Sequence, residues 1–314
     1  MEKIERFRLN WLMDYFCNFN CPYCYYPDKN IRHTLEKKGE IKGKEFLSKL
    51  HNCHINMTGG EPFLYPNFIE ICTLLTKNEN TIGILTNLSS DLIYEFAEKI
   101  NPKDVIHIRA SLHLTELNKF KSKNLFIERY KFLKKKGFNI DVSAVMWPPI
   151  FKKFKKIYRE FESNGINIIP LSFFGDYNSK SYPRDYTKKE VNIIKKYWDK
   201  TNKIFFNGKY NNEVEIIDSK LYLKGSLCLT GLDYAIISPN GDIKRCFSDN
   251  LIIGNIYTDK KINLFKVIKP CESEYCTCPW EGYTYSIGKK EEISKKVYKK
   301  NKGYIMNILN KLIK

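Results

Sequence analysis

Short apolar runs alternate with longer amphipathic segments over residues 1–175 of the chain. Six of these runs, rich in β-branched and aromatic residues, have the length of buried strands: 7–14, 54–58, 81–86, 104–112, 140–146 and 167–173. Apolar residues at helical spacing fill the intervals, over residues 66–77, 91–100, 119–136 and 150–164. Strands that alternate with helices predict a parallel sheet covered by helices, which is the α/β class.

Beyond residue 175 the alternation weakens. Residues 176–183 are expected to form a loop and residues 187–203 a helix. Two apolar runs, 234–238 and 243–247, flank Asn240-Gly241, and Asn-Gly in such a position is a strong signal for a β-hairpin. We therefore divide the chain into a barrel core, a connector, a small hairpin-containing domain and a lysine-rich C-terminal helix, at residues 1–175, 176–224, 225–286 and 287–314.

Composition adds two expectations. The first residues lack the apolar core of a signal peptide, and no stretch approaches the roughly 20 apolar residues of a membrane span. We expect a cytoplasmic protein without a membrane span. The net charge of +18 is compatible with binding to nucleic acid, but it arises mainly from lysine, and lysine-rich helix surfaces explain it more simply.

Three of the ten cysteines lie in one short loop after the first predicted strand, Cys17-Asn18-Phe19-Asn20-Cys21-Pro22-Tyr23-Cys24. Soft thiolate ligands select iron–sulfur clusters or zinc. Three thiolates can hold three irons of a four-iron cluster and leave the fourth iron open to a substrate. A structural zinc ion would need a fourth ligand, and His33 is the nearby candidate.

The loop resembles the cluster-binding motif of the radical S-adenosylmethionine (SAM) superfamily, and three further segments resemble that family in the family's order. Met57-Thr58-Gly59-Gly60-Glu61-Pro62 matches its Gly-Gly-Glu-Pro segment after the second strand. Ile84-Leu85-Thr86-Asn87 and Arg109-Ala110-Ser111-Leu112-His113 match the ends of the third and fourth strands. The resemblance implies a partial (β/α)6 barrel, similar to an incomplete TIM barrel, with its site at the C-terminal ends of the strands.

The resemblance also implies a site. Cys17, Cys21 and Cys24 would hold a [4Fe–4S] cluster that binds SAM, and they are the catalytic residues in this interpretation. Glu61 would accept a hydrogen bond from the ammonium group of SAM. Arg109 either meets the SAM carboxylate or closes a core salt bridge, and His113 stands where many relatives have Asp, so its ribose contact is in doubt. The residues expected around SAM are Tyr23, Gly59, Gly60, Glu61, Asn87, Arg109, Ser111, His113 and Val145.

Five further cysteines lie near the C-terminus. Cys228 and Cys246 are separated by the predicted hairpin, in the spacing C-x12-G-x4-C. This spacing resembles the auxiliary-cluster domains called SPASM and twitch, although too few cysteines remain for two closed clusters. We expect one auxiliary [4Fe–4S] cluster, with a zinc ribbon as the alternative. The candidate ligands are Cys228, Cys246, Cys271, Cys276 and Cys278.

These observations together predict a radical SAM oxidoreductase or maturase. By resemblance, it would cleave SAM reductively to a 5′-deoxyadenosyl radical that removes hydrogen from a peptide, a protein side chain or a small molecule such as a sugar. Its electrons would come from an external flavodoxin- or ferredoxin-type donor. The auxiliary cluster would assist oxidation or bind the substrate. The alternative is an iron–sulfur protein that binds or modifies nucleic acid, with the charge of +18 as its motivation.

Overall fold

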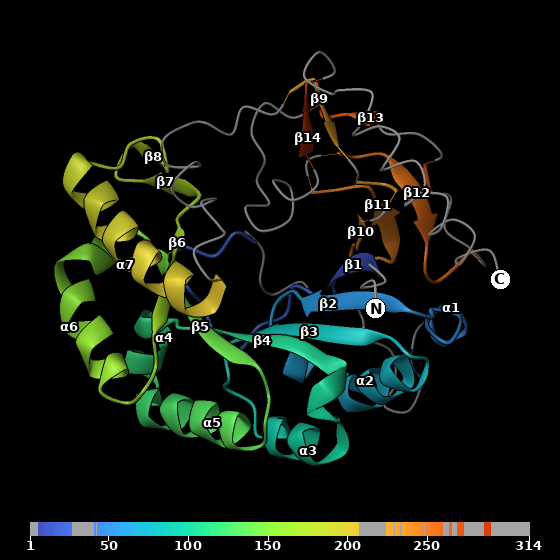
Figure 1. Cartoon of the computed structure of the whole chain (residues 1–314), viewed down its shortest axis with the longest axis horizontal. Helices are drawn as coiled ribbons and strands as arrows, with labels where there is room; N and C mark the ends of the chain where they lie inside the picture. Colours follow the sequence, from blue (N-terminus) through green and yellow to red (C-terminus); the bar gives the residue numbers. More distant parts are fainter. Residues whose placement is uncertain are drawn as a thin grey trace.

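The computed structural model of the chain describes residues 6–26, 41, 43–206, 224–228, 230–232, 234–247, 249–259, 264–265, 269–272 and 286–289. Its central feature is a sheet of nine strands: β1 (Phe7–Leu12), β2 (Cys53–Thr58), β3 (Thr81–Thr86), β4 (Val105–Ser111), β5 (Ile140–Met146), β6 (Ile168–Ser172), β10 (Tyr234–Ile237), β11 (Asp242–Lys244) and β12 (Ile252–Asn255). Their order is β12-β11-β10-β1-β2-β3-β4-β5-β6 (Figure 1). The sheet is open, because β6 and β12 form its two edges.

Strands β1 to β6 all run parallel, as the alternating pattern predicts. Each of the six predicted strands is present, with ends displaced by at most two residues. The predicted α/β class and the partial-barrel arrangement are therefore confirmed. Buried parallel strands are the elements that continuous apolar runs specify most clearly, because both of their faces are covered.

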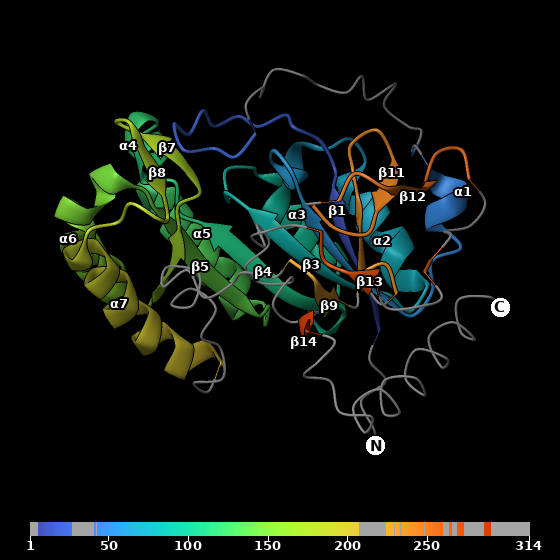
Figure 2. The same ribbon diagram turned by 90° about the horizontal axis from the view of Figure 1, so that it is seen from above.

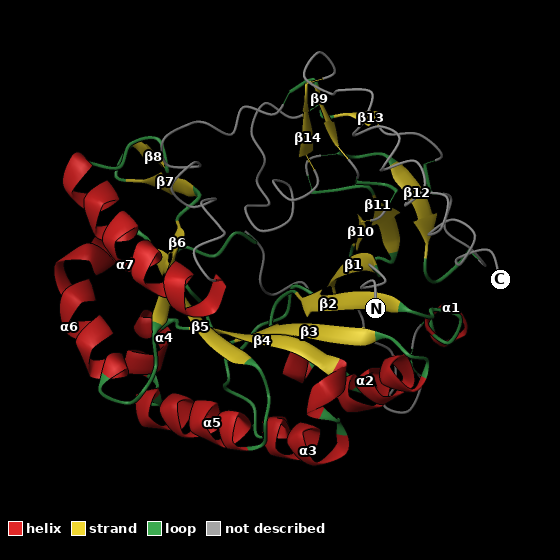
Figure 3. Ribbon diagram, viewed as in Figure 1, coloured by secondary structure: helices red, strands yellow, loops and turns green. Residues whose placement is uncertain are grey.

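Helices lie outside the curved sheet (Figures 1 and 3). They are α1 (Lys44–Leu47), α2 (Phe68–Lys77), α3 (Leu92–Lys99), α4 (Leu114–Lys119), α5 (Lys123–Lys135), α6 (Phe151–Glu162) and α7 (Lys188–Phe206), with 3₁₀ turns η1 (Pro62–Leu64), η2 (Pro102–Asp104) and η3 (Pro148–Ile150). The single helix expected over 119–136 is wrong at its start. The chain turns at Lys121, whose φ is 52°, and this turn separates α4 from α5. Figure 2 shows α6 and α7 at the opposite side of the molecule from β11 and β12.

The two faces of the sheet differ in polarity. Trp11 and Ile55 are fully buried in the main apolar core. The opposite, inner face carries Asn10 and Asn56, which are cross-strand neighbours on β1 and β2. Gly83 stands next in this row, and a Cβ atom there would lie 2.1 Å from Asn56 Oδ1. A polar inner face of this kind suits a barrel that encloses polar ligands better than one that is filled with apolar side chains.

The predicted hairpin near the C-terminus is present. Strands β10 and β11 are antiparallel, and Gly241 in their turn has a φ of 86°, a value that glycine adopts without strain. Strand β10 also pairs parallel with β1, so the hairpin extends the central sheet. A smaller sheet follows, formed by β9 (Ser226–Cys228), β13 (Lys269–Pro270) and β14 (Ser286–Lys289). The expected lysine-rich helix over 287–314 lies outside the described residues, except that residues 287–289 belong to strand β14.

Residues 176–183, which we expected to form a loop, contain a second hairpin of β7 (Gly175–Tyr177) and β8 (Lys180–Tyr182). Its turn residues Asn178 and Ser179 both have positive φ. Two consecutive residues of positive φ form the primed turns that join twisted antiparallel strands. Asn-Ser is a weaker signal for such a turn than Asn-Gly, and the hairpin was missed for this reason.

The helices that the structure describes include none that is both long enough and apolar enough to cross a lipid bilayer.

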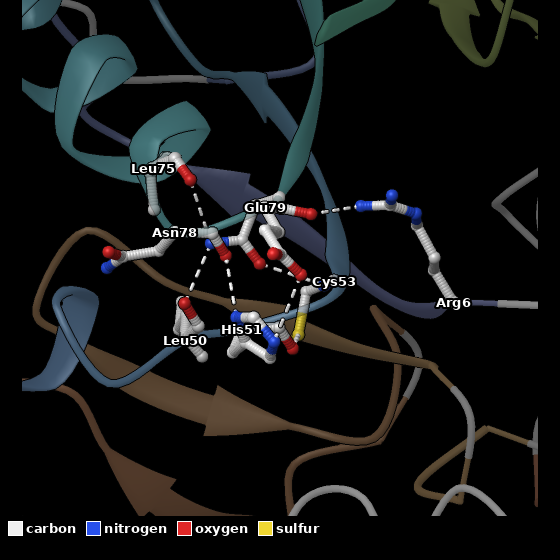
Figure 4. Close-up of polar contacts among 8 residues, drawn as sticks. Arg6, Leu50, His51, Cys53, Leu75, Asn78 and Glu79 are labelled. Atoms are coloured by element: carbon white, nitrogen blue, oxygen red, sulfur yellow. Dashed lines mark hydrogen bonds and ion pairs between the residues drawn. The ribbon is translucent and has the colours of Figure 1, made fainter.

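One buried asparagine, Asn80, connects the segments that precede β2 and β3. Asn80 is 1% exposed, and its Nδ2 donates to the carbonyl oxygens of Leu50 at 2.8 Å and Leu75 at 3.0 Å. Its Oδ1 accepts from the backbone N–H of Cys53 at 2.8 Å. The surrounding turn is tied further by His51, whose imidazole contacts the carbonyl of Asn78 (Figure 4).

We predict that Asn80→Ala lowers the free energy of unfolding by about 2–4 kcal/mol, because it leaves buried backbone groups without partners. The matched control is Asn78→Ala in the same turn. The Asn78 side chain donates to the carbonyl of Ser48, a bond at the exposed surface, so its loss should cost less than about 1 kcal/mol. Urea unfolding of both variants measures the difference. Equal losses would contradict the role given to Asn80.

Candidate functional site

A cavity of about 280 Å³ lies at the C-terminal ends of the parallel strands. Thr58, Leu85, Ser111 and Val145 bring the ends of β2 to β5 to its wall. All three cysteines of the N-terminal loop line the same cavity. The remaining lining residues are Tyr15, Phe19, Tyr23, Tyr25, Tyr26, Gly59, Gly60, Thr86, Asn87, His113, Ser172, Phe173 and Phe174. None of these lining residues is Asp, Glu, Lys or Arg.

The cysteine loop starts directly after β1 and is shaped by Asp14. The Asp14 carboxylate accepts hydrogen bonds from the backbone N–H groups of Tyr15 at 2.5 Å and Phe16 at 3.1 Å. This Asx-type turn reverses the chain at the end of the strand. Farther along, the Cys24 N–H donates to the Cys21 carbonyl at 3.1 Å, which closes a tight turn between the last two cysteines.

Gly59 and Gly60 allow the next strand end to touch this loop. The Gly60 N–H donates to the Asp14 carbonyl at 2.7 Å, and the Glu61 N–H donates to the Phe16 carbonyl at 2.9 Å. A Cβ atom on Gly60 would lie 1.7 Å from the Phe16 carbonyl oxygen, so no other residue fits. Gly59 has a φ of 138°, which also favours glycine. The two glycines therefore fix the cysteine loop against β2.

Glu61 is placed differently from the expectation. Its side chain is not part of the cavity lining; the residue is 3% exposed and its carboxylate points to β3. Oε1 accepts from the Thr86 hydroxyl at 2.7 Å and from the Phe63 N–H at 3.2 Å, and Oε2 accepts from the Asn87 N–H at 2.6 Å. Burial raises the pKa of this carboxyl from 4.5 to about 7, although the three donors act in the opposite direction. Glu61 thus connects the glycine segment to the end of β3.

Asn87, at the end of β3, points to the cysteine loop. Its Nδ2 donates to Asn18 Oδ1 at 3.1 Å and lies 3.6 Å from the Cys17 sulfur. The next residue, Leu88, has a φ of 56°, and its carbonyl accepts from the buried guanidinium of Arg129 at 2.8 Å. A bulky residue with positive φ is strained, so an interaction is needed to hold it. Arg129 supplies that interaction and also pairs with the carboxylate of Asp91.

The other side of the cavity is aromatic. The Tyr23 hydroxyl and His113 Nδ1 are 3.1 Å apart, and the Tyr23 ring lies 5.2 Å from that of Trp147. Burial is the main cause that raises the pKa of Tyr23, so its hydroxyl stays protonated. His113 directly precedes α4, while Ser111 and Val145 line the cavity from β4 and β5. His113 therefore lines the cavity and occupies the N-cap position of α4, where its side chain makes no capping hydrogen bond.

Arg109 does not reach the cavity, which corrects its inclusion among the residues around SAM. It forms a two-bond ion pair with Asp141 on the neighbouring strand, at 2.7 and 2.9 Å. Arg109 lies on the same face as Ser111, as the alternation predicts, but one layer deeper in the barrel. The alternative of a core salt bridge is the one that the structure contains.

The donor atoms around Cys17 fit a thiolate that binds a metal. The Phe19 N–H donates to the Cys17 sulfur at 3.4 Å, and the Asn87 amide approaches it from the other side. Burial raises the pKa of the Cys17 thiol to about 11, and metal binding would displace the proton. Over the described ranges, no three Cys, His, Asp or Glu side chains converge on one point as the ligands of a single ion would. A four-iron cluster spreads its thiolates over separate irons.

Three of the C-terminal cysteines, Cys228, Cys246 and Cys271, lie among the described residues. Cys228 is buried with Tyr234 and Ile236, and Cys246 packs against this cluster. Burial raises the pKa of Cys228, while its sulfur accepts from the Thr230 hydroxyl at 3.4 Å. Cys271 follows β13 directly, and its carbonyl accepts from the Gly225 N–H. Cys276 and Cys278 lie outside the described residues.

Several residues of the site escaped the sequence analysis. Thr86 ends β3 one residue before Asn87 and lines the cavity, so its position at a strand end was the available signal. Asp14 is the last residue of the predicted strand, and the sequence gives no further signal for its role in the turn. Arg129 lies within a helix far along the chain, and no local pattern distinguishes it from a surface arginine. The rings of Tyr15 and Tyr26 lie on the cavity wall in a tilted arrangement, with centroids 5.3 Å apart.

Comparisons with known proteins agree with this geometry. The sequence profile of the Radical SAM superfamily matches residues 12–147. The subtilosin biosynthesis protein AlbA of Bacillus subtilis (strain 168) is 22% identical over 311 residues, which cover 91% of this chain and 68% of AlbA. A 7-carboxy-7-deazaguanine synthase of Clostridium acetobutylicum is 31% identical over 80 residues, 24% of this chain and 35% of that protein.

Solved structures share the fold. SuiB of Streptococcus suis bound to S-adenosylmethionine aligns with a TM-score of 0.55 at 13% identity, over 82% of this chain and 64% of SuiB. The chain thus spans less than two thirds of SuiB. The enzyme anSMEcpe, with bound AdoMet and a peptide, aligns with a TM-score of 0.56 at 18% identity, over 83% of this chain and 80% of that protein. The segment over residues 12–147, which contains the three cysteines and the glycine segment, thus matches the Radical SAM superfamily.

Proposed function

We propose that the protein cleaves SAM reductively and uses the resulting radical to modify a peptide. The observation that carries this proposal is the single cavity that collects the three cysteines, the two glycines and Asn87 from separate strand ends. The same cavity contains no ionisable carboxylate or ammonium side chain among the residues that line it. A lining without these charges suits a ligand whose charged groups are bound by the iron–sulfur cluster and not by the side chains.

The cysteines, the two glycines and Val145 would hold the cluster and contact SAM. Cys17, Cys21 and Cys24 would hold a [4Fe–4S] cluster, which when bound supplies the electron that splits SAM into methionine and a 5′-deoxyadenosyl radical. The Cys17 sulfur already accepts from one backbone N–H, an arrangement that stabilises a thiolate. The backbone at Gly59 and Gly60 is free of side chains and can approach the ligand closely. Val145 would provide an apolar contact for the adenine.

The polar residues would orient SAM. Asn87 and Ser111 present an amide and a hydroxyl at the ends of neighbouring strands. Tyr23 and His113 together close the side of the cavity next to α4. Glu61 acts in this proposal as a positioning residue, because its carboxylate holds Thr86 and Asn87 and not the ligand itself.

A peptide substrate is supported by the relatives. AlbA is named for the biosynthesis of a bacteriocin, SuiB has been crystallised with the precursor peptide SuiA, and anSMEcpe with a bound peptide. We extend this substrate class to the present chain. The aromatic residues at the cavity, including Tyr15, Tyr25 and Tyr26, offer an apolar and hydrogen-bonding surface to such a peptide.

We also propose one auxiliary [4Fe–4S] cluster in a small C-terminal domain over residues 225–286. The proposal is supported by Cys228 and Cys246, which share one small cluster of buried residues. Arg245 is 4% exposed, and its Nε donates at 3.2 Å to the Thr230 hydroxyl that contacts Cys228. A buried cation near thiolates favours their charged form. Cys271, Cys276 and Cys278 remain the candidates for the other ligands.

Replacement of Cys17, Cys21 and Cys24 together by Ala should abolish the formation of 5′-deoxyadenosine in dithionite-reduced protein. Mass spectrometry after anaerobic reconstitution measures the product. The matched control is Cys53→Ala, since Cys53 is a fully buried thiol in β2 that packs in the apolar core. Formation of 5′-deoxyadenosine by the triple variant would refute the proposed use of these thiols.

The Cys228→Ala variant and the Cys246→Ala variant should each contain about four irons per chain fewer than the wild type, which is the content of one [4Fe–4S] cluster. Because metal binding also stabilises a small domain, the C-terminal part should become more sensitive to proteolysis. Uncoupled SAM cleavage should persist while peptide modification stops. Iron analysis and Mössbauer spectra beside the 5′-deoxyadenosine assay test this expectation. A full complement of iron in either variant would remove the auxiliary cluster from the account.

The raised pKa of Glu61 predicts a pH effect on stability. Between the unfolded value of 4.5 and the folded value of about 7, the native state binds more protons than the unfolded state. Stability therefore falls as the pH rises through this window, by roughly 3 kcal/mol in total. Glu61→Gln should lack this dependence. Urea unfolding of both proteins from pH 5 to 8 measures the difference, because the contributions of all other titrating groups cancel between them. Parallel curves of unfolding free energy against pH would contradict the raised pKa of Glu61.

A further inference from the structure

A basic and aromatic surface lies beside the cysteine loop; we call Lys119, Phe120 and Lys121 the α4-end surface. Phe120 is 51% exposed, although large aromatic side chains are usually covered. The Lys119 ammonium lies 5.0 Å from the centre of its ring, and the Lys119 side chain is 60% exposed. The acidic neighbour, Glu116, lies 3.7 Å from the Lys119 ammonium, but its side chain is buried and also accepts a hydrogen bond from the Asn20 N–H at 3.1 Å. The exposed charge of this surface is therefore positive.

An apolar hollow adjoins the same surface. It has a volume of about 240 Å³, and Phe120 forms part of its wall. The other lining residues are Asn18, Phe19, Leu88, Ser89, Leu117, Ser122, Leu125, Phe126 and Arg129. An exposed aromatic ring next to an apolar hollow with a charged rim is typical of a surface that contacts another protein.

Phe19 connects this surface to the cysteines. Its ring stacks on Phe120 with centroids 5.7 Å apart and an interplanar angle of 14°. Phe19 lines the hollow and also lines the cavity that holds the three cysteines. It stands between Cys17 and Cys21 in the loop, and its N–H donates to the Cys17 sulfur. One aromatic side chain thus separates the outside surface from the cavity of the proposed cluster.

We propose that the α4-end surface is the docking site for a small acidic electron-carrier protein that reduces the iron–sulfur centre at Cys17, Cys21 and Cys24. This inference rests on the proposed function. In the transfer, the reduced flavin or iron–sulfur centre of the carrier loses one electron and the centre of this protein gains it, with no bond made or broken. The net charge of +18 would attract an acidic carrier over longer range, and the two lysines would orient it at the loop.

The test compares two reductants on the full, reconstituted chain. Reduced flavodoxin is the protein donor, and dithionite is the small donor that needs no docking surface. The variants are Lys119→Glu with Lys121→Glu, and a milder pair, Lys119→Gln with Lys121→Gln, which avoids repulsion of Glu116. The matched control is Lys134→Glu with Lys135→Glu. Both control lysines are exposed at the far end of α5, about 17 Å along the helix from its start, and give the same change in net charge.

Stopped-flow oxidation of the reduced flavodoxin measures the rate of electron transfer at low ionic strength. We expect the Glu pair to slow it by about tenfold or more, the Gln pair to slow it less, and the control pair to leave it near wild type. Dithionite should reduce all the variants at the wild-type rate.

Equal slowing by the surface pair and the control pair would show a general effect of charge and overturn the proposal. An unchanged rate in the surface pair would overturn it as well. If the surface pair lost binding to a single-stranded RNA probe but kept its rate with flavodoxin, the surface would be assigned to nucleic acid instead. Failure of dithionite to reduce the wild-type protein would count against the proposed function itself, and so the two failures are distinguishable.

Discussion

The close approach of the Gly59–Glu61 backbone to the cysteine loop is the constraint on which the site depends. Two backbone hydrogen bonds, at 2.7 and 2.9 Å, join this segment to the Asp14 and Phe16 carbonyls. The space for them exists only because position 60 has no side chain. The loop has no regular secondary structure over residues 13–26, so its shape must come from such contacts. Without them, the three thiols would have no fixed positions relative to the ends of the strands.

A second set of contacts fixes the glycine segment, the end of β3 and the cysteine loop relative to one another. The carboxylate of Glu61 binds the hydroxyl of Thr86 and the N–H of Asn87, and Arg129 holds the carbonyl of Leu88 in the following turn. Asn87 then returns to the cysteine loop through Asn18. The result is a closed ring of interactions: cysteine loop, glycine segment, end of β3, and cysteine loop again. Buried polar networks of this kind specify one arrangement when all their members are satisfied.

The sequence predicted the strands well because each carries apolar residues that pack in the main core. It predicted the site as far as strand ends reveal it, so Asn87, Ser111 and Val145 were expected at the cavity and lie there. The sequence could not predict how far from the cavity a side chain lies along its strand. Arg109 shares a face with Ser111, but the presence of Asp141 opposite it on β5 determines that it forms a salt bridge.

Other features depend on contacts between distant parts of the chain. The addition of β10 to β1 needs a register that no local pattern contains. The positions of Glu61 and Arg129 depend on which donors and acceptors surround them after folding. The β7–β8 hairpin was missed for a local reason, since its turn lacks glycine.

The central claim is that the cluster at Cys17, Cys21 and Cys24 leaves one iron open, to which SAM binds. Electron paramagnetic resonance of the reduced, reconstituted protein with and without SAM tests it most directly. To isolate this cluster, the measurement is best made on the Cys228→Ala variant. SAM should change the spectrum, because a new ligand joins an iron that lacks a cysteine. A spectrum of a four-iron cluster that SAM leaves unchanged would contradict the account.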